Sequence, residues 1–350
     1  MIPSVTISRP ATTRPPAMAD VAALAGVSHQ TVSRVLNGHR SVRPATREKV
    51  LEAIAELGYR RNSAARALVT ARSTTVGVVT TGSPLFGPSS TLIAVEEAAR
   101  EQGWYVSVAT LRRYDAETMH KALEHFMDQA VEGIVVIAPH TDVADAVESF
   151  QAPVPVVIIA ARDLKPDVPT IPLAVDQRAG ARLAVEHLIG LGHQRILHVA
   201  GPPDWLDAVE REESWRAVLT EHGLPVLGPV VAGWTADRGY MVGLDLAQRV
   251  KAGSGPTAVF AANDQLALGL LRAFWECGVS VPDDVSVVGF DDVDGSGHFI
   301  PPLTTVRQPF VDLGRRSVAL LLAAVDGGTP GAELIAPELV VRRSAAAPRR

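Results

Sequence analysis

Several features that mark other classes of protein are missing from this 350-residue sequence. It contains one cysteine, Cys277, so it cannot form an internal disulfide, which fits a reducing compartment. It has no run of about 18 or more apolar residues, the length that a membrane-spanning helix needs. Residues 1–17 carry Arg9 and Arg14 but no apolar stretch, so we interpret them as a disordered leader rather than a secretory signal. These absences predict a protein of the cytoplasm without a membrane partner.

The short motifs of common catalytic sites are also missing. The sequence contains no Gly-x-Ser-x-Gly, no Gly-x-Gly-x-x-Gly, no phosphate-loop lysine motif and no paired Cys/His metal spacing. Asp291 and Asp292 are adjacent acids and ten histidines are present, so an enzyme acting on glycosides is the rival interpretation. Adjacent residues of an extended strand point apart, however, so these two acids cannot flank one bond. We therefore expect that the protein is not an enzyme and that it has no catalytic residue, no metal site and no cofactor.

Charge is distributed unevenly along the chain, whose formal net charge is −5. The first 75 residues contain eleven Lys/Arg and four Asp/Glu, a balance of +7, which leaves −12 for the remainder. A basic end on an acidic body indicates that only the end meets a polyanion such as nucleic acid. An ordinary fluctuation of charge would look the same, so charge alone leaves both interpretations open.

Three short helical patterns occupy the basic end. The first, residues 18–24, stops at Gly26, where glycine can take the positive φ of a tight turn. Ser28 can cap the second helix, which runs to Asn37. Two short helices joined by such a turn have the geometry of a helix-turn-helix. The third helix runs from Pro44 to Leu57 and presents the apolar stripe Val50, Leu51, Ile54 and Leu57.

The second helix of this head has one polar and one apolar face. Val32, Val35 and Leu36 point toward the first helix. A polar arc of this makeup can enter the major groove, where Arg34 can reach guanine bidentately and Gln30 can pair adenine. A helix face that is merely exposed to solvent would be equally polar. The turn, the helix length and the charge, however, all favour a helix that recognises DNA bases. The arc consists of His29, Gln30, Ser33, Arg34 and Asn37.

From Thr74 onward, short β-branched runs alternate with longer amphipathic runs. This alternation predicts parallel sheets covered by helices. Because the alternating segment is about 275 residues long, which is too long for a single sheet, we expect two lobes. Ligands of open parallel sheets lie beyond the carboxyl ends of the strands, which here indicates a cleft between the lobes. The expected strands are 76–79, 104–108, 133–137, 154–159, 195–200, 258–261 and 285–289. The expected helices are 92–103, 116–130, 142–150, 178–191, 211–223 and 265–278.

The head resembles that of the LacI/GalR family of repressors, which implies a bacterial protein associated with the nucleoid. The resemblance rests on the runs Asp20–Asn37, Thr46–Val50 and Asn62–Leu68. It implies that residues 62–69 fold as a hinge helix on operator DNA, with Leu68 wedged into the minor groove. His29 stands where a close member carries an aromatic phenol, so the operator sequence is expected to differ. The implied DNA contacts are His29, Gln30, Thr31, Ser33, Arg34, Asn37, Arg47, Asn62, Arg66 and Leu68.

The resemblance extends over nearly all of the remaining chain. Residues 262–269, 289–292 and 300–308 resemble the family's sensor, which is similar to periplasmic sugar-binding proteins. Asp and Asn can bond vicinal hydroxyls, Arg can donate to sugar oxygens, and a tryptophan face can pack on sugar C–H groups. The effector contacts that the resemblance implies are Pro88, Arg113, Arg211, Trp234, Asn263, Gln265, Asp291 and Phe310, and we add Trp205 to them.

Plain structural roles are the alternatives for these residues. Asp291 could cap a loop, Asp292 could face solvent, and Arg211 could pair with a neighbouring surface glutamate. Trp205 and Trp234 could be core residues, as tryptophans more often are.

Two departures from the family pattern concern the ligand. Ile137 and Ala160 stand where a close member places polar residues near its sugar, and Trp205 and Asp207 add groups that it lacks. We therefore expect a saccharide site, for a galactoside or other glycoside, with its own selectivity. The open alternatives are a corepressor such as a purine, and an activator with the same fold.

The sequence predicts an all-α helix-turn-helix head with a hinge helix, followed by a two-lobed α/β core of periplasmic-binding-protein type. A two-fold homodimer would match a palindromic operator, and the last residues contain no leucine heptads for a tetramer. The expected segments are the leader 1–17, the head 18–61, the hinge and linker 62–73, the core 74–345 and a tail 346–350. Within the core, the first lobe comprises about 74–173 and 306–334, and the second about 174–305 and 335–345.

Overall fold

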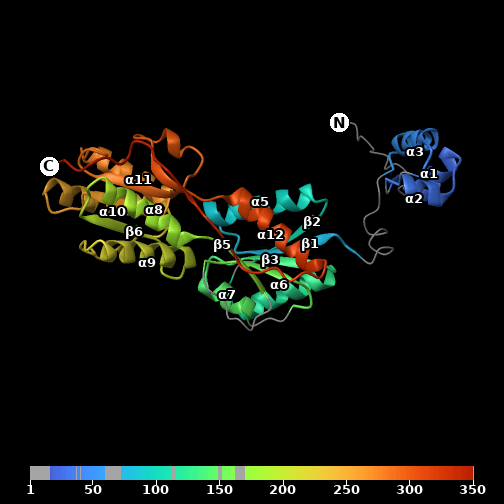
Figure 1. Ribbon diagram of the computed structural model, residues 1–350, viewed down its shortest axis with the longest axis horizontal. Coiled ribbons are helices and arrows are strands. Elements are labelled where there is room, and N and C mark those ends of the chain that lie inside the picture. The colour runs from blue at the N-terminus through green and yellow to red at the C-terminus, as the bar shows by residue number, and fades with distance from the viewer. Residues whose placement is uncertain are drawn as a thin grey trace, which may run out of the picture. The chain divides into compact units, whose positions relative to one another are not determined.

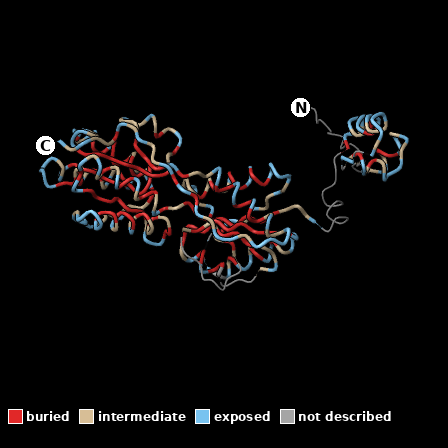
Figure 2. Tube along the Cα trace, in the orientation of Figure 1, coloured by how far each residue is buried: buried red, intermediate tan, exposed pale blue. Residues whose placement is uncertain are grey.

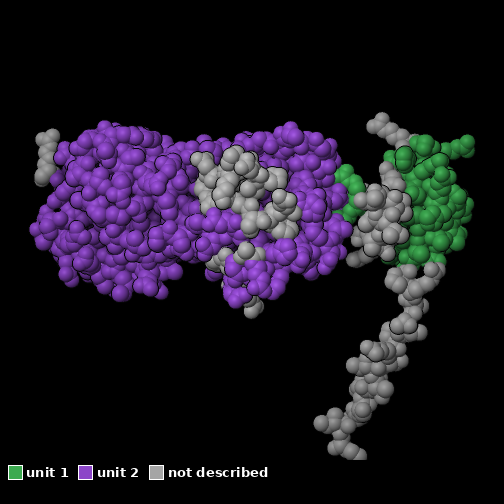
Figure 3. Space-filling model, turned by 90° about the horizontal axis from the view of Figure 1, so that it is seen from below, with its two compact units in different colours: residues 1–73 green, residues 74–350 purple. Residues whose placement is uncertain are grey.

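The computed structural model describes residues 16–36, 38–39, 41–59, 72–111, 113, 115–148, 152–161 and 170–349. The chain divides into two compact units, residues 1–73 and residues 74–350, which Figure 3 colours separately. Within the described ranges, no helix is both long and apolar enough to cross a membrane.

The first unit contains the helices α1 (Met18–Ala25), α2 (His29–Leu36) and α3 (Pro44–Leu57). Gly26 follows α1 with a φ of 65°, as the predicted turn requires. The backbone N–H of Thr31 donates to Ser28 Oγ over 3.2 Å, so Ser28 caps α2 as predicted. Asn37, the predicted last residue of the second helix, lies outside the described residues.

The apolar face of α3 differs from the predicted stripe at one position. Leu51 is 52% exposed, whereas Val50 and Ala53 are buried. The prediction for Leu51 is wrong because it lies about 100° around the helix from Val50 and so turns away from the core. Ala53 takes the buried position instead.

In the second unit, the first sheet has the strand order β11-β5-β4-β3-β1-β2, and all neighbouring strands are parallel. We call this sheet and its helices the first lobe. The helices α6 (Ala116–Asp128) and α7 (Thr141–Glu148) cover one face, and α5 (Phe86–Glu101) and α12 (Phe310–Val325) cover the other. The strands are β1 (Thr75–Thr80), β2 (Tyr105–Thr110), β3 (Gly133–Ile137), β4 (Val156–Ile159), β5 (Thr170–Val175) and β11 (Glu333–Ile335).

The second sheet has the order β12-β10-β9-β8-β6-β7, in which only the β10–β12 pair is antiparallel. This sheet and its helices form the second lobe. The helices α8 (Gln177–Gly190) and α9 (Leu206–Glu221) cover one face, and α10 (Ala236–Lys251) and α11 (Asp264–Glu276) cover the other. The remaining elements are β6 (Ile196–Ala200), β7 (Val230–Val231), β8 (Ala258–Ala261), β9 (Ser286–Asp291), β10 (Thr304–Arg307), β12 (Glu338–Val340) and the short 3₁₀ helix η1 (Ser296–His298).

The chain crosses between the lobes three times: from β5 to α8, from β10 to α12, and from β11 to β12 (Figure 1). In each lobe the buried residues follow the strands, and the exposed ones lie on the outer sides of the helices (Figure 2). Two sheets of this kind put the carboxyl ends of several strands beside the crossovers. That edge is where a ligand site is expected.

Two helices begin earlier than the sequence predicts. Helix α5 begins at Phe86 rather than near Leu92, and α9 begins at Leu206 rather than at Arg211. The start of α5 was missed because it contains Pro88, and proline usually marks the end of a helical pattern. Proline nevertheless fits the first turn of a helix, whose N–H groups have no helical partner. Both extensions bring residues into the cleft between the lobes.

Candidate functional site

A cleft between the two lobes collects side chains from several elements. Arg211 comes from α9, Asn263 caps α11, and Asp291 ends β9. The cleft contains two adjoining cavities of about 30 and 50 Å³. We call the smaller one the polar cavity because its lining includes Asp207, Arg211, Asn263, Asp291 and Gln308. Phe86, Pro88, Trp205 and Trp234 complete most of its wall.

Arg211 is the cation in the wall of the polar cavity. It is only 2% exposed, and its Nε donates to Gln177 Oε1 over 2.9 Å. Its guanidinium lies 3.8 Å from the centre of the Phe290 ring. The carboxylates of Asp207 and Asp291 flank it at 3.7 and 3.8 Å. The predicted alternative of a surface ion pair with a neighbouring glutamate therefore does not describe Arg211, which is held inside the cleft.

Asp291 enters the cleft from the last position of β9. It has a φ of 109°, a backbone conformation that residues other than glycine rarely adopt. Its Oδ1 accepts a hydrogen bond from Gln308 Nε2 at 2.8 Å. Burial raises the pKa of Asp291 to about 6, although the nearby Arg211 acts in the opposite direction. The strained backbone and the buried carboxyl together suit a functional position better than a loop cap.

Asn263 joins two loops of the second lobe at the cleft. Its Oδ1 accepts from the N–H of Leu266, which caps α11, and its Nδ2 donates to the carbonyl of Trp234 over 3.1 Å. The Trp234 indole N–H is buried and makes no hydrogen bond within the described part of the chain. Trp234, a residue of the cavity wall, therefore carries a buried donor that the described part of the chain leaves unsatisfied.

Trp205 links the polar cavity to the first lobe. Its ring packs edge-on against Trp234, with 5.3 Å between ring centroids, and against His140, with 4.5 Å. An isolated antiparallel bridge joins His140 and Trp205, and the N–H of Leu206 donates to the carbonyl of Pro139 over 2.9 Å. Trp205 is thus both a wall of the cavity and a point where the lobes are joined.

The larger cavity is lined mainly by the first lobe, and we call it the apolar cavity. Residues at the ends of β3 and β4 supply Ile137, Ala138, Ile159, Ala160 and Ala161. Pro88, at the start of α5, and Phe310, at the start of α12, lie in the same wall. Ile137 and Ala160, the residues that replace polar groups of a close family member, both lie in this cavity.

Two of the predicted effector contacts lie outside these cavities. The Arg113 side chain is 72% exposed and pairs with Asp115 at 3.2 Å. Gln265 is partly buried on the first turn of α11 but is not among the lining residues. Gln177 and Gln308 were not predicted, yet both line the site and hydrogen-bond each other over 2.9 Å. Gln308 directly follows β10 and Gln177 comes two residues after β5, at points where the chain crosses between the lobes, and these positions could have identified them.

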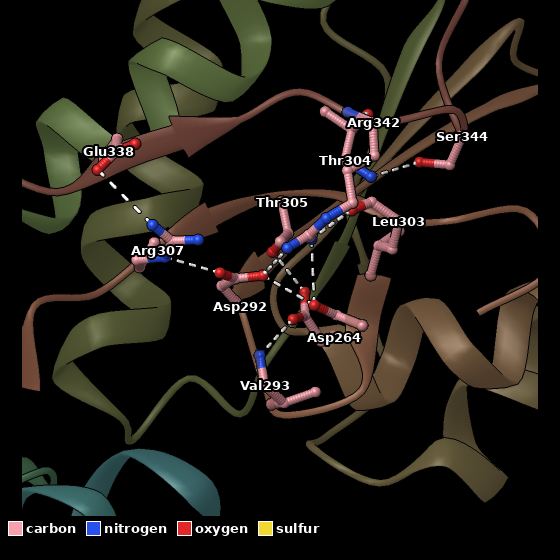
Figure 4. A network of polar contacts seen from close by, with 11 residues as sticks. Asp264, Asp292, Val293, Leu303, Thr304, Thr305, Arg307, Glu338, Arg342 and Ser344 are labelled. Carbon is pink, nitrogen blue, oxygen red and sulfur yellow. Dashed lines mark hydrogen bonds and ion pairs between the residues drawn. The ribbon is translucent and has the colours of Figure 1, made fainter. Parts of the chain in front are cut away.

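A second buried polar network lies beside the cleft (Figure 4). The buried carboxylate of Asp264 accepts from Thr305 Oγ1 over 2.5 Å and from the N–H of Val293 over 2.8 Å. Burial raises the pKa of Asp264 to about 8. Because its oxygens are bonded by β10 and by the loop after β9, Asp264 fixes the backbone that carries Asp291.

Asp292 belongs to the same network and does not face solvent, in contrast to one of the alternatives from the sequence. Its side chain is 8% exposed and forms ion pairs with Arg307 at 2.7 Å and Arg342 at 2.6 Å. Although burial raises the pKa of Asp292, hydrogen bonds from Ser296 and the two arginines outweigh it and lower the pKa below its ordinary value. Asp291 therefore lines the polar cavity, whereas the adjacent Asp292 pairs with two arginines beside it. The two acids do not form a catalytic pair.

In the first unit, α2 presents the predicted polar face. His29, Gln30 and Arg34 are exposed, and Thr31 and Ser33 are partly buried. Arg47 is partly buried at the start of α3, and its Nη2 donates to the carbonyl of His39 over 2.7 Å. The other four predicted DNA contacts lie outside the described residues: Asn37, Asn62, Arg66 and Leu68.

A helix-turn-helix unit with an exposed polar second helix, followed by two lobes around a polar cleft, defines a class of protein: a DNA-binding protein with a ligand sensor. The chain belongs to the LacI family of bacterial regulatory proteins. Residues 17–62 match the family "Bacterial regulatory proteins, lacI family", and residues 185–345 match the periplasmic binding protein-like domain.

Individual relatives agree with this assignment. The chain is 38% identical to the lactose operon repressor of Escherichia coli (strain K12) over 337 residues, which cover 96% of this chain and 92% of that protein. The crystal structure of the lac repressor dimer bound to operator and the anti-inducer ONPF superposes with a TM-score of 0.82 at 36% identity, covering 95% of this chain and all of that one. The CelR–cellobiose complex gives a TM-score of 0.68 at 33% identity, over 94% and 99% of the two chains.

The predicted fold class is therefore confirmed: a helix-turn-helix head and a two-lobed core of parallel sheets. The predicted class of activity is confirmed as well. The chain is a DNA-binding transcriptional regulator of the LacI family and not an enzyme.

Proposed function

We propose that the chain represses a sugar-utilisation operon and that a small saccharide bound in the cleft releases it from its operator. The observation that carries this proposal is the arrangement of Arg211, Asn263 and Asp291 around one small cavity walled by two tryptophans. Carboxylate, amide and guanidinium groups bond sugar hydroxyls from fixed directions. Aromatic rings pack on the C–H faces of the same sugar.

The relatives support the same proposal. The lac repressor structure is a dimer bound to operator DNA, and CelR is seen in complex with cellobiose. For this chain we accordingly propose a homodimer that works in the cytoplasm on a palindromic operator. Two heads related by a two-fold axis read two half-sites of such a sequence.

On the DNA side, we propose that α2 lies in the major groove, with His29, Gln30 and Arg34 at the base edges. Residues 62–73 then act as hinge and linker between the head and the core, with Leu68 in the minor groove and Arg66 at the narrow groove or phosphate. Residues 1–17 and 346–350 stay outside these functions, and the lobes divide near residues 174, 306 and 335. The remaining proposed DNA contacts are Thr31, Ser33, Asn37, Arg47 and Asn62.

On the effector side, we propose direct contacts from Pro88, Trp205, Arg211, Trp234, Asn263, Asp291 and Phe310. Arg113 and Gln265 would then act from the rim of the cleft. A melting-temperature screen of the full chain against sugars and purines tests the class of effector, because a ligand that binds only the folded state raises the melting temperature. We expect sugars to raise it. A shift with purines alone would favour the corepressor alternative.

Two substitutions test the site itself. Asp291→Ala and Asn263→Ala should each weaken sugar binding about 10- to 100-fold, because buried hydroxyls lose partners worth about 1–3 kcal/mol. Asp245→Ala is the matched control, since that side chain is 72% exposed on α10. Calorimetry well below the melting temperature measures all three affinities, and DNA binding without sugar should survive. Unchanged affinity in both cleft variants would remove these residues from the site.

A further inference from the structure

The two carboxylates of the polar cavity differ in how they are bonded. Asp291 Oδ1 accepts from Gln308 Nε2 over 2.8 Å. The side chain of Asp207 accepts no hydrogen bond from the described part of the chain, and it forms only a loose ion pair with Arg211 at 3.7 Å. Because this side chain is 31% exposed, water can reach its oxygens. A ligand can therefore bond to Asp207 without breaking a hydrogen bond within the protein.

Arg211 has one nitrogen near both carboxylates. Its Nε donates to Gln177 and its Nη1 donates to the carbonyl of Ala262. Its Nη2 lies 3.7 Å from Asp207 Oδ2 and 3.8 Å from Asp291 Oδ1, which is too far for a hydrogen bond to either oxygen. The polar cavity therefore offers one donor nitrogen with two carboxylate acceptors around it.

Two hydroxyls on adjacent carbons match this arrangement. Each hydroxyl can accept from one of the two N–H bonds of Arg211 Nη2 and donate its own hydrogen to one carboxylate. The polar cavity, at about 30 Å³, has room for about two water-sized groups. It can therefore admit two hydroxyls, although it cannot hold a sugar ring.

The ring of such a sugar has room in a wider hollow that adjoins the polar cavity. Phe86, Asp291 and Gln308 line both the polar cavity and this hollow, whose volume is about 410 Å³. The rings of Phe86 and Phe310, which also lines the hollow, pack edge to face with 5.5 Å between centroids. Aromatic rings pack on the C–H faces of sugars. A sugar in the hollow can thus direct two hydroxyls into the polar cavity.

We propose that Asp207 is a further effector-binding residue, which accepts a hydrogen bond from a hydroxyl adjacent to the one that donates to Asp291. The site then selects sugars with two adjacent free hydroxyls. This inference rests on the proposed function, since it adds a residue to the same site.

Asp207 also lies in the first turn of α9, where a negative charge stabilises a helix. The two roles of Asp207 predict different results with altered sugars. A charge that only stabilises the helix would not distinguish one sugar hydroxyl from its neighbour, whereas a direct hydrogen bond depends on one hydroxyl alone.

Calorimetry on the full-length protein tests the inference. The probes are D-glucose, D-galactose, D-mannose and their methyl β-glycosides, followed by the monodeoxy derivatives of the sugar that binds most tightly. Removal of either of two adjacent hydroxyls should weaken binding to the wild-type protein about 10- to 100-fold, because hydrogen bonds to charged groups are the stronger ones.

Asp207→Ala should bind the parent sugar about 10- to 100-fold more weakly. It should no longer distinguish the parent from one of the two deoxy derivatives, while it still distinguishes the parent from the other. Asp207→Asn keeps the shape and one acceptor oxygen, so its loss should be smaller, and it is measured against the same derivatives if the alanine variant does not fold. Asp237→Ala is the matched control, because Asp237 is an exposed first-turn acid of α10 that lines neither cavity.

Equal weakening of the parent sugar and all its deoxy derivatives by Asp207→Ala would give Asp207 a structural role and overturn the inference. Wild-type affinity of this variant, or wild-type losses only at hydroxyls that are not adjacent, would overturn it as well. In each of these cases a sugar-responsive regulator would stand. Binding of a purine with no binding of any of these sugars would overturn the proposed function together with the inference.

Discussion

Arg34 is exposed near the end of α2, on the side opposite the buried Val32 and Val35. If this face lies in the major groove and Arg34 contacts a guanine, Arg34→Ala should weaken the free energy of operator binding by about 1–3 kcal/mol. It should also relax the sequence preference at that base pair. Lys49→Ala is the comparison, since we expect this exposed lysine on α3 to touch phosphate; its loss should weaken binding to all sequences and flatten the salt dependence. Fluorescence anisotropy with an operator and its single-base variants measures both effects. An Arg34→Ala protein with wild-type affinity and preference would rule out this docking.

His198 lies wholly inside the second lobe, with its ring stacked on Phe260 at 4.7 Å between centroids. Burial lowers its pKa to about 3, against about 6.5 in an unfolded chain. Between those values the unfolded state binds a proton that the folded state does not, so the free energy of unfolding falls as the pH drops below about 6.5.

His198→Phe should remove this acid sensitivity. We expect the loss of unfolding free energy between pH 7 and pH 5 to be about 2 kcal/mol smaller in the variant. Urea titrations of both proteins at the two pH values measure the difference, and the contributions of Asp264 and Asp291 cancel in the comparison. An identical pH dependence in both proteins would show that His198 does not titrate in this way.

The packing of α10 on α11 depends on glycine. A Cβ added to Gly269 would lie 2.0 Å from the carbonyl oxygen of Ala236, so the two helices could not keep their distance. Gly269→Ala should therefore destabilise the protein by about 1–3 kcal/mol or more. Gly190→Ala, at the exposed end of α8 with nothing near the new methyl, should instead be neutral or stabilise by up to about 1 kcal/mol. Urea unfolding measures both, and equal effects of the two substitutions would contradict this account of the packing.

Most strands and helices could be predicted from the alternation of short β-branched and long amphipathic runs. The elements that could not be predicted have physical reasons. Strand β5 contains Pro172, which is uncommon in a paired strand, and β7, β11 and β12 have only two or three residues each. Helices α10 and α12 contain glycines that lower their helical signal, and these glycines are explained only by the neighbouring helix that passes close to them.

The cleft was predictable to a similar degree. Asn263 and Asp291 follow strands, and parallel strands bring their carboxyl ends to one edge, so their meeting could be foreseen. Trp205 and Asp207 come from the start of a helix that the sequence placed too late. Arg113 projects from a loop, and no periodicity sets the direction of such a side chain.

The assembly should be a dimer. We expect light scattering at micromolar concentration to give twice the mass of one chain, as a two-fold pair of heads on a palindromic site requires. A stable tetramer would contradict this prediction, and a monomer would leave the head with too short a site for specific binding.

Coupling between the head and the cleft is the central claim about the molecule as a whole. Sugar and operator need only prefer different arrangements of the lobes, and a coupling of about 1–3 kcal/mol suffices for release. Leu68→Ala should lose most specific DNA affinity and keep sugar affinity, because Leu68 is proposed to act only in the minor groove. Salt-matched titrations with sugar and with DNA separate the two affinities.

The most direct measurement is the affinity of the dimer for its sugar with and without operator DNA, the operator being selected from a random library with the full chain. Thermodynamic reciprocity requires that operator weaken sugar binding by the same factor by which sugar weakens operator binding. We predict a factor of about 5 to 150 in both directions. Equal sugar affinities with and without operator would mean that the cleft and the head are not coupled, and release by sugar would be contradicted.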